Sequence, residues 1–279
     1  YKRQQDAEAH NNLGITLQEL GRLDEAEASL NQAIALKPAF VEAHYNLGIT
    51  LKELGRLDEA EVSYTQAIAL KPEFFLAYTN LGNTLKGLDR MEEAGASYIQ
   101  AIALKPEIAE AHSNLGVTLR ELGRLEDAIA SLRDAISLRP HYAEAHVNLA
   151  ITLKDLGRFD EAQISYTQAI ALNPDLVEAR YNLGVMLFER QQHKAAAEQF
   201  DGIEFKESKI FSLRCSYLER DEITFNEKLD SAINDGELNA VIGSLVSCAE
   251  ARFGSNRFNP FCNCLLYTSD AADEGLGVD

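Results

Sequence analysis

The 279-residue sequence has no tryptophan and only four cysteines, Cys215, Cys248, Cys262 and Cys264, all near one end. Thiols placed this way do not build a disulfide framework, and they favour a reducing, cytoplasmic location. Positive charge is scarce as well, because 26 Lys and Arg against 44 Asp and Glu leave a formal charge of −18. Such a surface repels phosphate groups, so neither nucleic acid nor a membrane is expected as a partner. No apolar run reaches the length of a transmembrane helix.

Motifs of catalysis are missing too. The sequence contains no P-loop, no GxGxxG, no HExxH and no GxSxG. Cys262-Asn263-Cys264 does not have the spacing of a zinc site. Paired carboxylates are abundant in so acidic a chain and therefore carry no information by themselves. The sequence predicts no catalytic site, no metal and no cofactor.

What the sequence does contain is a repeat. Five prolines, Pro38, Pro72, Pro106, Pro140 and Pro174, each follow the last by 34 residues. The same step relates whole segments, as "AEAHNNLGITLQELGRLDEAEASLNQAIALKP" does to "VEAHYNLGITLKELGRLDEAEVSYTQAIALKP". The six units span 7–40, 41–74, 75–108, 109–142, 143–176 and 177–204, and positions within each are counted from its first residue.

Each unit predicts two helices. In the second unit, apolar residues recur every three or four positions from Val41 to Leu54, and Gly55 supplies the positive φ that ends a helix. Asp58 follows where the next helix dipole favours negative charge, and Pro72 stops that helix.

Small residues recur where two helices must approach closely. They are Gly14, Gly48, Gly82, Gly116, Ala150 and Gly184 in the first helix, and Ala26, Ala60, Ala94, Ala128, Ala162 and Ala196 in the second. One helix pair cannot bury its own apolar faces, so neighbouring pairs must stack.

These residues resemble the tetratricopeptide repeat family. The family signature is matched in the second unit by Leu47, Gly48, Ala60, Tyr64, Ala67 and Pro72. The resemblance covers residues 7–204 and implies an all-α, right-handed solenoid of antiparallel helix pairs. The sequence departs from the family where His10, His44, Tyr78, His112, His146 and Arg180 replace its usual Trp, and where Asp89 and Gln191 replace the turn glycine.

Asparagine occupies position 6 of every unit, as Asn12, Asn46, Asn80, Asn114, Asn148 and Asn182. Stacked first helices line the inner face of a solenoid about 10 Å apart, and an extended peptide advances about 3.3 Å per residue. An amide both donates and accepts hydrogen bonds, so this row could hold a peptide backbone of any sequence. The row resembles the asparagine ladder of O-linked N-acetylglucosamine transferases. The alternative is that these residues only fill or cap locally.

The neighbours of the asparagine row predict the chemistry of a partner. Positions 2 and 13 are mostly acidic: Glu8, Glu42, Glu110, Glu144 and Glu178, then Glu19, Glu53, Glu121, Asp155 and Glu189. Position 9 is mostly aliphatic. A neutral or basic extended segment therefore fits best, and the carboxylate-clamp type of repeat domain is disfavoured. Position 12 carries Lys52, Lys86, Arg120 and Lys154, which we expect to pair with nearby acids.

Four histidines, His10, His44, His112 and His146, share one repeat position. Residues one repeat apart cannot converge on one ion with bonds of about 2 Å, so a packing role is expected rather than metal binding.

Residues 205–253 predict a degenerate helical repeat with a capping helix, with helices at 208–219, 222–234 and 237–252. Residues 254–263 read as a linker. The stretch "NAVIGSLVSCAEARFGSNRFNPFCN" resembles bacterial proteins in which such arrays precede a 2-oxoglutarate/iron(II) oxygenase domain, although no catalytic residue of that domain has a match here.

The last residues differ from everything before them. "CLLYTSDAADE", residues 264–274, resembles a sequencing adapter translated in one reading frame. We therefore expect 264–279 to be non-native, the gene to continue past Asn263, and Tyr1 to be a boundary of the read.

The sequence thus predicts a protein-interaction scaffold that binds an extended segment along an asparagine-lined groove. The alternative is the substrate-recruiting arm of a modifying enzyme: an oxygenase, or a glycosyl- or sulfotransferase. A spacer with an unoccupied groove is the third possibility.

Overall fold

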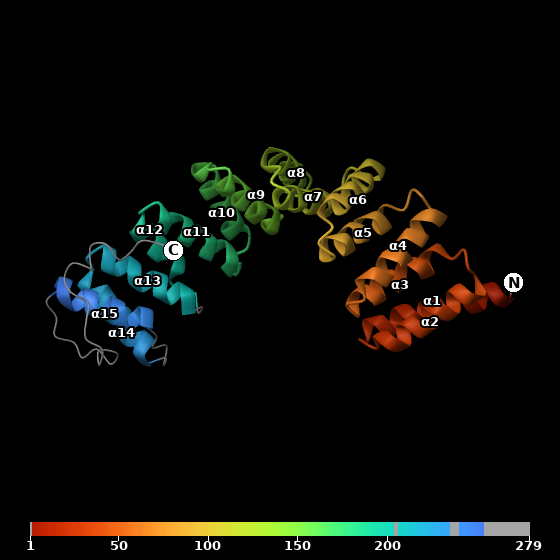
Figure 1. Ribbon diagram of the computed structural model, residues 1–279, viewed down its shortest axis with the longest axis horizontal. Coiled ribbons are helices and arrows are strands. Elements are labelled where there is room, and N and C mark those ends of the chain that lie inside the picture. Colours follow the sequence, from red (N-terminus) through yellow and green to blue (C-terminus); the bar gives the residue numbers. More distant parts are fainter. Residues whose placement is uncertain (1, 204–205, 235–239, 254–279) are drawn as a thin grey trace. The chain divides into compact units, whose positions relative to one another are not determined.

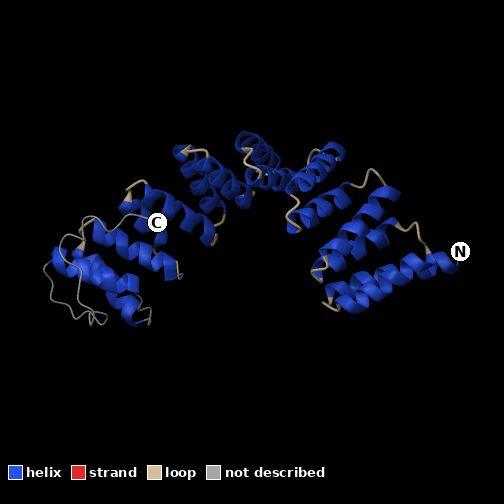
Figure 2. Ribbon diagram, in the orientation of Figure 1, coloured by secondary structure: helices blue, strands red, loops and turns tan. Residues whose placement is uncertain are grey.

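The computed structural model describes residues 2–203, 206–234 and 240–253. The described residues form fifteen α-helices and no strand, which confirms the all-α class (Figure 2). The helices are α1 (Lys2–Glu19), α2 (Leu23–Leu36), α3 (Val41–Glu53), α4 (Leu57–Leu70), α5 (Phe75–Gly87), α6 (Met91–Leu104), α7 (Ala109–Glu121), α8 (Leu125–Leu138), α9 (Ala143–Asp155), α10 (Phe159–Leu172), α11 (Val177–Glu189), α12 (His193–Phe200), α13 (Lys206–Leu218), α14 (Glu222–Asn234) and α15 (Ala240–Phe253).

The chain divides into two compact units, Tyr1–Gln168 and Ala169–Asp279, and the division falls inside α10. In the first unit, helices pack in pairs: α1 on α2, α3 on α4, α5 on α6, and α7 on α8. The second helix of each pair also packs on the first helix of the next pair (Figure 1). Successive first helices touch as well, α1 to α3, α3 to α5, α5 to α7 and α7 to α9. This is the packing of a helix-pair solenoid.

Close packing inside each pair depends on the small residues of the first helix. A Cβ added to Gly48 would lie 2.7 Å from Cε1 of Tyr64, and one added to Gly82 would lie 2.6 Å from Cε1 of Tyr98. Both tyrosine side chains are fully buried. The large ring of the second helix therefore occupies the space that glycine leaves, as the sequence predicted.

The turn within each pair uses one residue in the left-handed region. Gly55 has φ 76°, and Asp89, the departure noted in the third repeat, adopts the same conformation with φ 61°. Glycine adopts this conformation at no steric cost, and Asp is one of the few other residues that tolerate it. The turn therefore keeps its shape although its residue changes.

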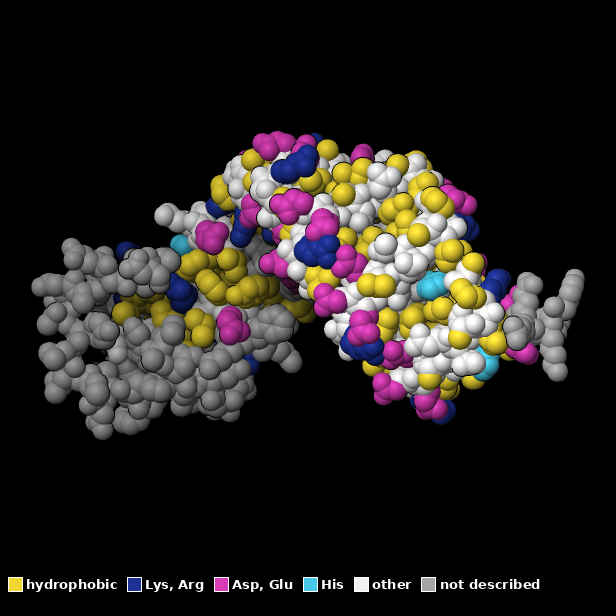
Figure 3. Space-filling model, turned by 45° about the vertical axis from the view of Figure 1, so that its right-hand side comes forward, with side chains coloured by type: hydrophobic (Ala, Val, Ile, Leu, Met, Phe, Trp, Pro, Cys, Tyr) yellow, Lys and Arg dark blue, Asp and Glu magenta, His cyan; other side chains and the backbone are white. Residues whose placement is uncertain are grey.

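Arginines at position 16 join the second helices of neighbouring repeats. Arg56 binds Glu59 of its own helix at 2.5 Å and Glu27 of the preceding repeat at 2.6 Å. Hydrogen bonding by Arg56 lowers the pKa of the Glu59 carboxyl. Arg90 forms the equivalent pairs with Glu93 and Glu61, both at 2.6 Å. Figure 3 shows such dark-blue basic side chains beside magenta acidic ones over the first unit.

The link to the preceding repeat is missing in the fourth repeat, and also in the fifth, where Ile129 takes the place of the acid. Arg124 binds Asp127 of its own helix at 2.6 Å. The position that holds Glu61 one repeat earlier is Gly95 here, which offers no carboxylate. The junction between the third and fourth repeats therefore lacks this pair.

The second unit contains α11 to α15. Here α12 packs on α11 and α13, and α13 packs on α14 and α15. One core cluster of this unit includes Leu213, Phe225, Leu229, Ile242 and Val246. The α12 helix has only 8 residues, whereas the second helices of the earlier repeats have 14. Residues 237–239, the first that the sequence predicts for the last helix, lie outside the described residues. Residues 254–279 do as well, so the predicted linker and the predicted non-native tail stay predictions. The predicted division into repeats, cap and tail also stays a prediction.

A side-chain cap begins α14. The backbone N–H of Thr224 donates to Oδ1 of Asp221 at 3.0 Å, and its hydroxyl donates to Oδ2 at 2.7 Å. These two bonds, the hydroxyl bond first, lower the pKa of Asp221. An acidic N-cap of this kind satisfies a free N–H and complements the helix dipole.

Candidate functional site

The asparagines of position 6 lie on successive first helices. In the first unit they are Asn12 on α1, Asn46 on α3, Asn80 on α5, Asn114 on α7 and Asn148 on α9. Asn12 is exposed and the other four are half-buried. In the second unit Asn182 lies on α11 and is half-buried. None of the six asparagines is fully buried, so each retains some contact with solvent.

Three of these amides bridge neighbouring repeats. Nδ2 of Asn46 donates to Oδ1 of Asn11 at 3.0 Å, and Nδ2 of Asn80 donates to the hydroxyl of Tyr45 at 2.8 Å. Nδ2 of Asn114 donates to Oδ1 of Asn83 at 3.1 Å. Each amide uses one N–H for the neighbouring first helix and retains a carbonyl oxygen and a second N–H.

The acceptors in these bridges could not be predicted from the sequence, in which the asparagine row looks free. They stand at position 5 (Asn11, Tyr45) or position 9 (Asn83), and their types differ from repeat to repeat. Tyr45 also packs on Phe74, with ring centroids 4.9 Å apart. The only signal in the sequence was that polar or aromatic residues recur beside the asparagines.

Some of the acidic residues beside the asparagine row are exposed, and others already form ion pairs within the chain. Glu42 and Glu144 at position 2 are exposed. Glu110 is bound by Arg139 at 2.5 Å. Burial acts to raise the pKa of Glu110, but the hydrogen bond from Arg139 and other favourable contacts outweigh it, so the pKa is lowered. The carboxylate is therefore ionised at neutral pH and partly neutralised by its partner.

A second row of bridges joins position 12 to position 13 of the next repeat. Gln18 Nε2 donates to Glu53 Oε1 at 2.9 Å. Lys86 lies 3.7 Å from Glu121, and Arg120 lies 3.6 Å from Asp155. The expectation that basic residues at position 12 pair with acids is correct for Lys86 and Arg120.

The shared histidines contact the loops between repeats. Nε2 of His44 lies 2.9 Å from the carbonyl oxygen of Pro38, and Nε2 of His112 lies 2.9 Å from that of Pro106. His146 makes the same contact with Pro140 at 3.3 Å. The carbonyl accepts, so the imidazole donates. Each ring therefore fastens its first helix to the loop before it, a polar role that the sequence did not predict.

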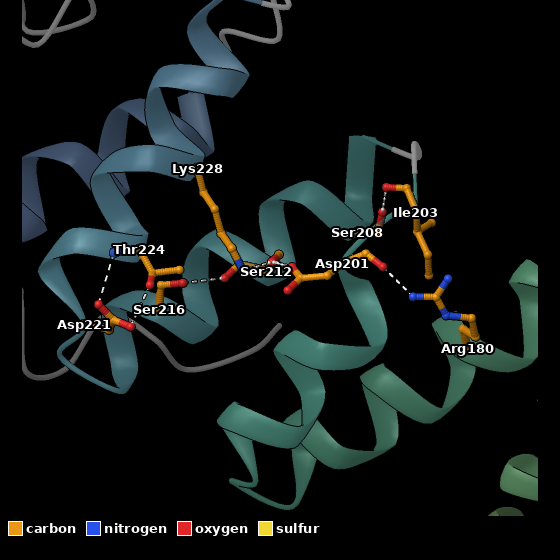
Figure 4. A network of polar contacts seen from close by, with 9 residues as sticks. All are labelled: Arg180, Asp201, Ile203, Ser208, Ser212, Ser216, Asp221, Thr224 and Lys228. Carbon is orange, nitrogen blue, oxygen red and sulfur yellow. Dashed lines mark hydrogen bonds and ion pairs between the residues drawn. The ribbon is translucent and has the colours of Figure 1, made fainter.

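The second unit holds a cluster of polar side chains near the end of α12 (Figure 4). Oδ1 of Asp201 accepts bonds from Ser212 at 3.0 Å and Lys228 at 2.9 Å, and Lys228 also donates to Ser212 at 2.7 Å. Arg180 donates to the Asp201 carbonyl oxygen. The adjacent cavity of about 310 Å³ is also lined by Lys209. The charges pair with one another, so this cluster serves to join α12, α13 and α14.

The described part of the chain contains no group of three or more His, Cys, Asp or Glu that could hold a metal ion. None of its helices combines the length and the apolar character needed to cross a membrane.

Family models for the tetratricopeptide repeat match residues 17–55, 41–74, 73–141, 107–175 and 147–208. Together these matches cover well over half of the chain, which belongs to the tetratricopeptide repeat family. No curated protein matches it. The matches do not extend to the resemblances to oxygenase-associated proteins and to O-linked N-acetylglucosamine transferases, which stay predictions.

Solved structures share the fold. A tetratricopeptide repeat protein from Parabacteroides merdae is 20% identical, with a TM-score of 0.65 over 87% of this chain and 98% of that one. MamA from Desulfovibrio magneticus is 22% identical, with a TM-score of 0.58 over 61% and 97%. YrrB, described as a TPR protein with an unusual peptide-binding site, is 21% identical, with a TM-score of 0.55 over 67% and 92%.

Proposed function

We propose that the chain is a protein-interaction scaffold that binds an extended, neutral or basic segment along the asparagine row. The observation that carries the proposal is the row itself, one part-exposed amide on each successive first helix. Even the amides that bridge repeats retain an acceptor and a donor, which are what a peptide backbone needs. The peptide-binding site described for YrrB supports the view that this fold can take such a role.

The charge of the surface supports the choice of partner. Most of the acids at position 2, including Glu42 and Glu144, are exposed along the same helices. Opposite charge accelerates association, and like charge suppresses wrong partners. We also retain the cytoplasmic location as a prediction from cysteine usage.

A displayed library of random peptides tests the proposal. Peptides of about 16 residues are long enough to span four repeats, given first helices about 10 Å apart. The decisive variant is Asn148→Ala, because the Asn148 side chain makes no hydrogen bond with any described residue and its loss should not weaken the fold. We expect the selected peptides to bind it about five- to tenfold more weakly, because one hydrogen bond that is shielded from water is lost.

The matched control is Gln66→Ala together with Gln100→Ala. Both amides are exposed and lie on the second helices α4 and α6, away from the row. These changes should leave affinity unchanged. If Asn148→Ala binds every selected peptide as tightly as the wild type does, the asparagine row is not the binding surface.

The recruiting-arm alternative requires a catalytic domain in addition to the repeats. The uninterrupted gene decides it: a β-rich domain with a His-x-Asp…His triad would make this chain part of an oxygenase. In either case the repeats would present the same surface.

A further inference from the structure

The third repeat breaks the pattern of the groove at three positions at once. Position 2 is Leu76 where the other repeats have Glu, and position 13 is Gly87 where they have Glu or Asp. Position 9 is Asn83 where they have Ile or Val. The Leu76 side chain is 42% exposed. The acidic edges are therefore interrupted at one place, on α5.

The loss of the acid at position 13 leaves one cation without its partner. Position 12 pairs with position 13 of the following repeat through Gln18 and Glu53, Lys86 and Glu121, and Arg120 and Asp155. By the same register Lys52 on α3 faces Gly87 on α5. Lys52 is half-buried and forms no ion pair with any residue that the structure describes. The row of bridges thus has a vacant place for one carboxylate.

A second donor lies beside that place. The Asn83 Oδ1 atom already accepts two hydrogen bonds, from the Tyr98 hydroxyl at 2.6 Å and from Asn114 at 3.1 Å. These bonds fix the orientation of the amide and leave its NH₂ group as the part available to a ligand. Asn83 stands four residues before Gly87, which places the two on the same side of α5.

We propose that the vacancy at Gly87 is a subsite for one acidic side chain of the bound segment, which Lys52 pairs with and the Asn83 amide hydrogen-bonds. The inference rests on the proposed function, because the asparagine row must hold the rest of the segment. The exposed acids on either side, such as Glu42, favour basic residues in the flanks of that segment.

The same random-peptide library tests this subsite on the full chain. Selection on the wild type should yield peptides with one Asp or Glu between basic residues. In the best of them, replacing that acid with its amide should weaken binding about tenfold, as expected for a charge-assisted hydrogen bond. The test variants are Lys52→Met, which removes the cation, and Gly87→Glu, which fills the vacancy with the chain's own carboxylate. Both should abolish the preference for the acid.

The control is Lys86→Met, whose lysine already pairs with Glu121, and it should keep the preference. A Cβ at Gly87 lies 3.0 Å from Cδ1 of Leu57, the end of a flexible side chain, so Gly87→Glu needs only a small shift. Thermal melting of each variant confirms that it folds.

Each outcome separates the two proposals. Peptides that bind through Asn148 but show no acid preference overturn the carboxylate subsite and leave the scaffold intact. An apolar residue selected in place of the acid also overturns it and points to Leu76 instead. A preference that survives both Lys52→Met and Gly87→Glu places the carboxylate elsewhere. If no peptide binds at all, both proposals are wrong.

Discussion

Two tyrosines in equivalent positions allow a matched test of the polar network under the groove. Tyr98 and Tyr64 are both fully buried against a glycine of the preceding helix. The Tyr98 hydroxyl donates to Asn83 at 2.6 Å, whereas the Tyr64 hydroxyl meets no hydrogen-bond partner among the described residues. Burial raises the pKa of both phenols, so both hydroxyls stay protonated. The difference between them arises at position 9, which is Asn83 in one repeat and Ile49 in the other.

Removing the two hydroxyls should therefore have opposite effects. Tyr98→Phe loses a buried hydrogen bond and should destabilise its repeat by about 1 kcal/mol. Tyr64→Phe removes an unsatisfied buried group and should stabilise its repeat by about the same amount. The global transition of a repeat array need not be two-state, so the assay is amide hydrogen exchange resolved by helix. Protection should fall about fivefold in α5 and α6 for the first variant, and rise about fivefold in α3 and α4 for the second.

A third variant closes the cycle. Asn83→Ile gives the third repeat the residue type of the second and leaves the Tyr98 hydroxyl without its acceptor, so adding Tyr98→Phe to it should then raise protection, as Tyr64→Phe does. Equal losses of protection for Tyr98→Phe and Tyr64→Phe would refute the reasoning, because they would show that the ring's packing and not its hydroxyl decides the effect.

Three further predictions concern the backbone and a helix cap. Gly82→Ala should destabilise its repeat by about 1–3 kcal/mol, measured by hydrogen exchange in α5 and α6, because the new Cβ would lie 2.6 Å from the Tyr98 ring. Gln191→Gly should raise the melting temperature, since Gln191 has φ 61° and glycine relieves about 1 kcal/mol of strain. The pKa of Asp221 is lower in the folded chain than in the unfolded one, so its stabilisation is complete above about pH 4 and is lost as pH falls further. Hydrogen exchange in α14 should therefore respond to Asp221→Ala at about pH 7 and cease to respond near about pH 2.

The helix pairs could be predicted from the sequence because a 34-residue period repeats the same local rules. The packing of Gly48 against Tyr64 can be predicted from residue size and spacing alone. The hydrogen bonds between neighbouring first helices cannot, because the bond from Asn80 to Tyr45 depends on how far the two helices are shifted along each other. The asparagine positions were visible in the sequence, whereas their partners were not. The vacancy facing Lys52 appears only once Lys86 and Glu121 establish the register of that row.

The missing link at Gly95 gives the first unit an uneven resistance to bending. Between the second and third repeats, Arg90 ties the second helices together through Glu61. Between the third and fourth, that tie is absent, while the bond from Asn114 to Asn83 still holds the first helices. Between the fourth and fifth the tie is also absent, because Ile129 takes that position, but Arg133 joins the second helices through Glu161 at 3.2 Å. Thermal bending should therefore concentrate between the third and fourth repeats and spread their second helices apart while the first helices stay in register. The array should flex there as a hinge whose axis lies at the contact between α5 and α7 and crosses the asparagine row, so that the curvature of the row changes while its neighbouring helices stay bonded.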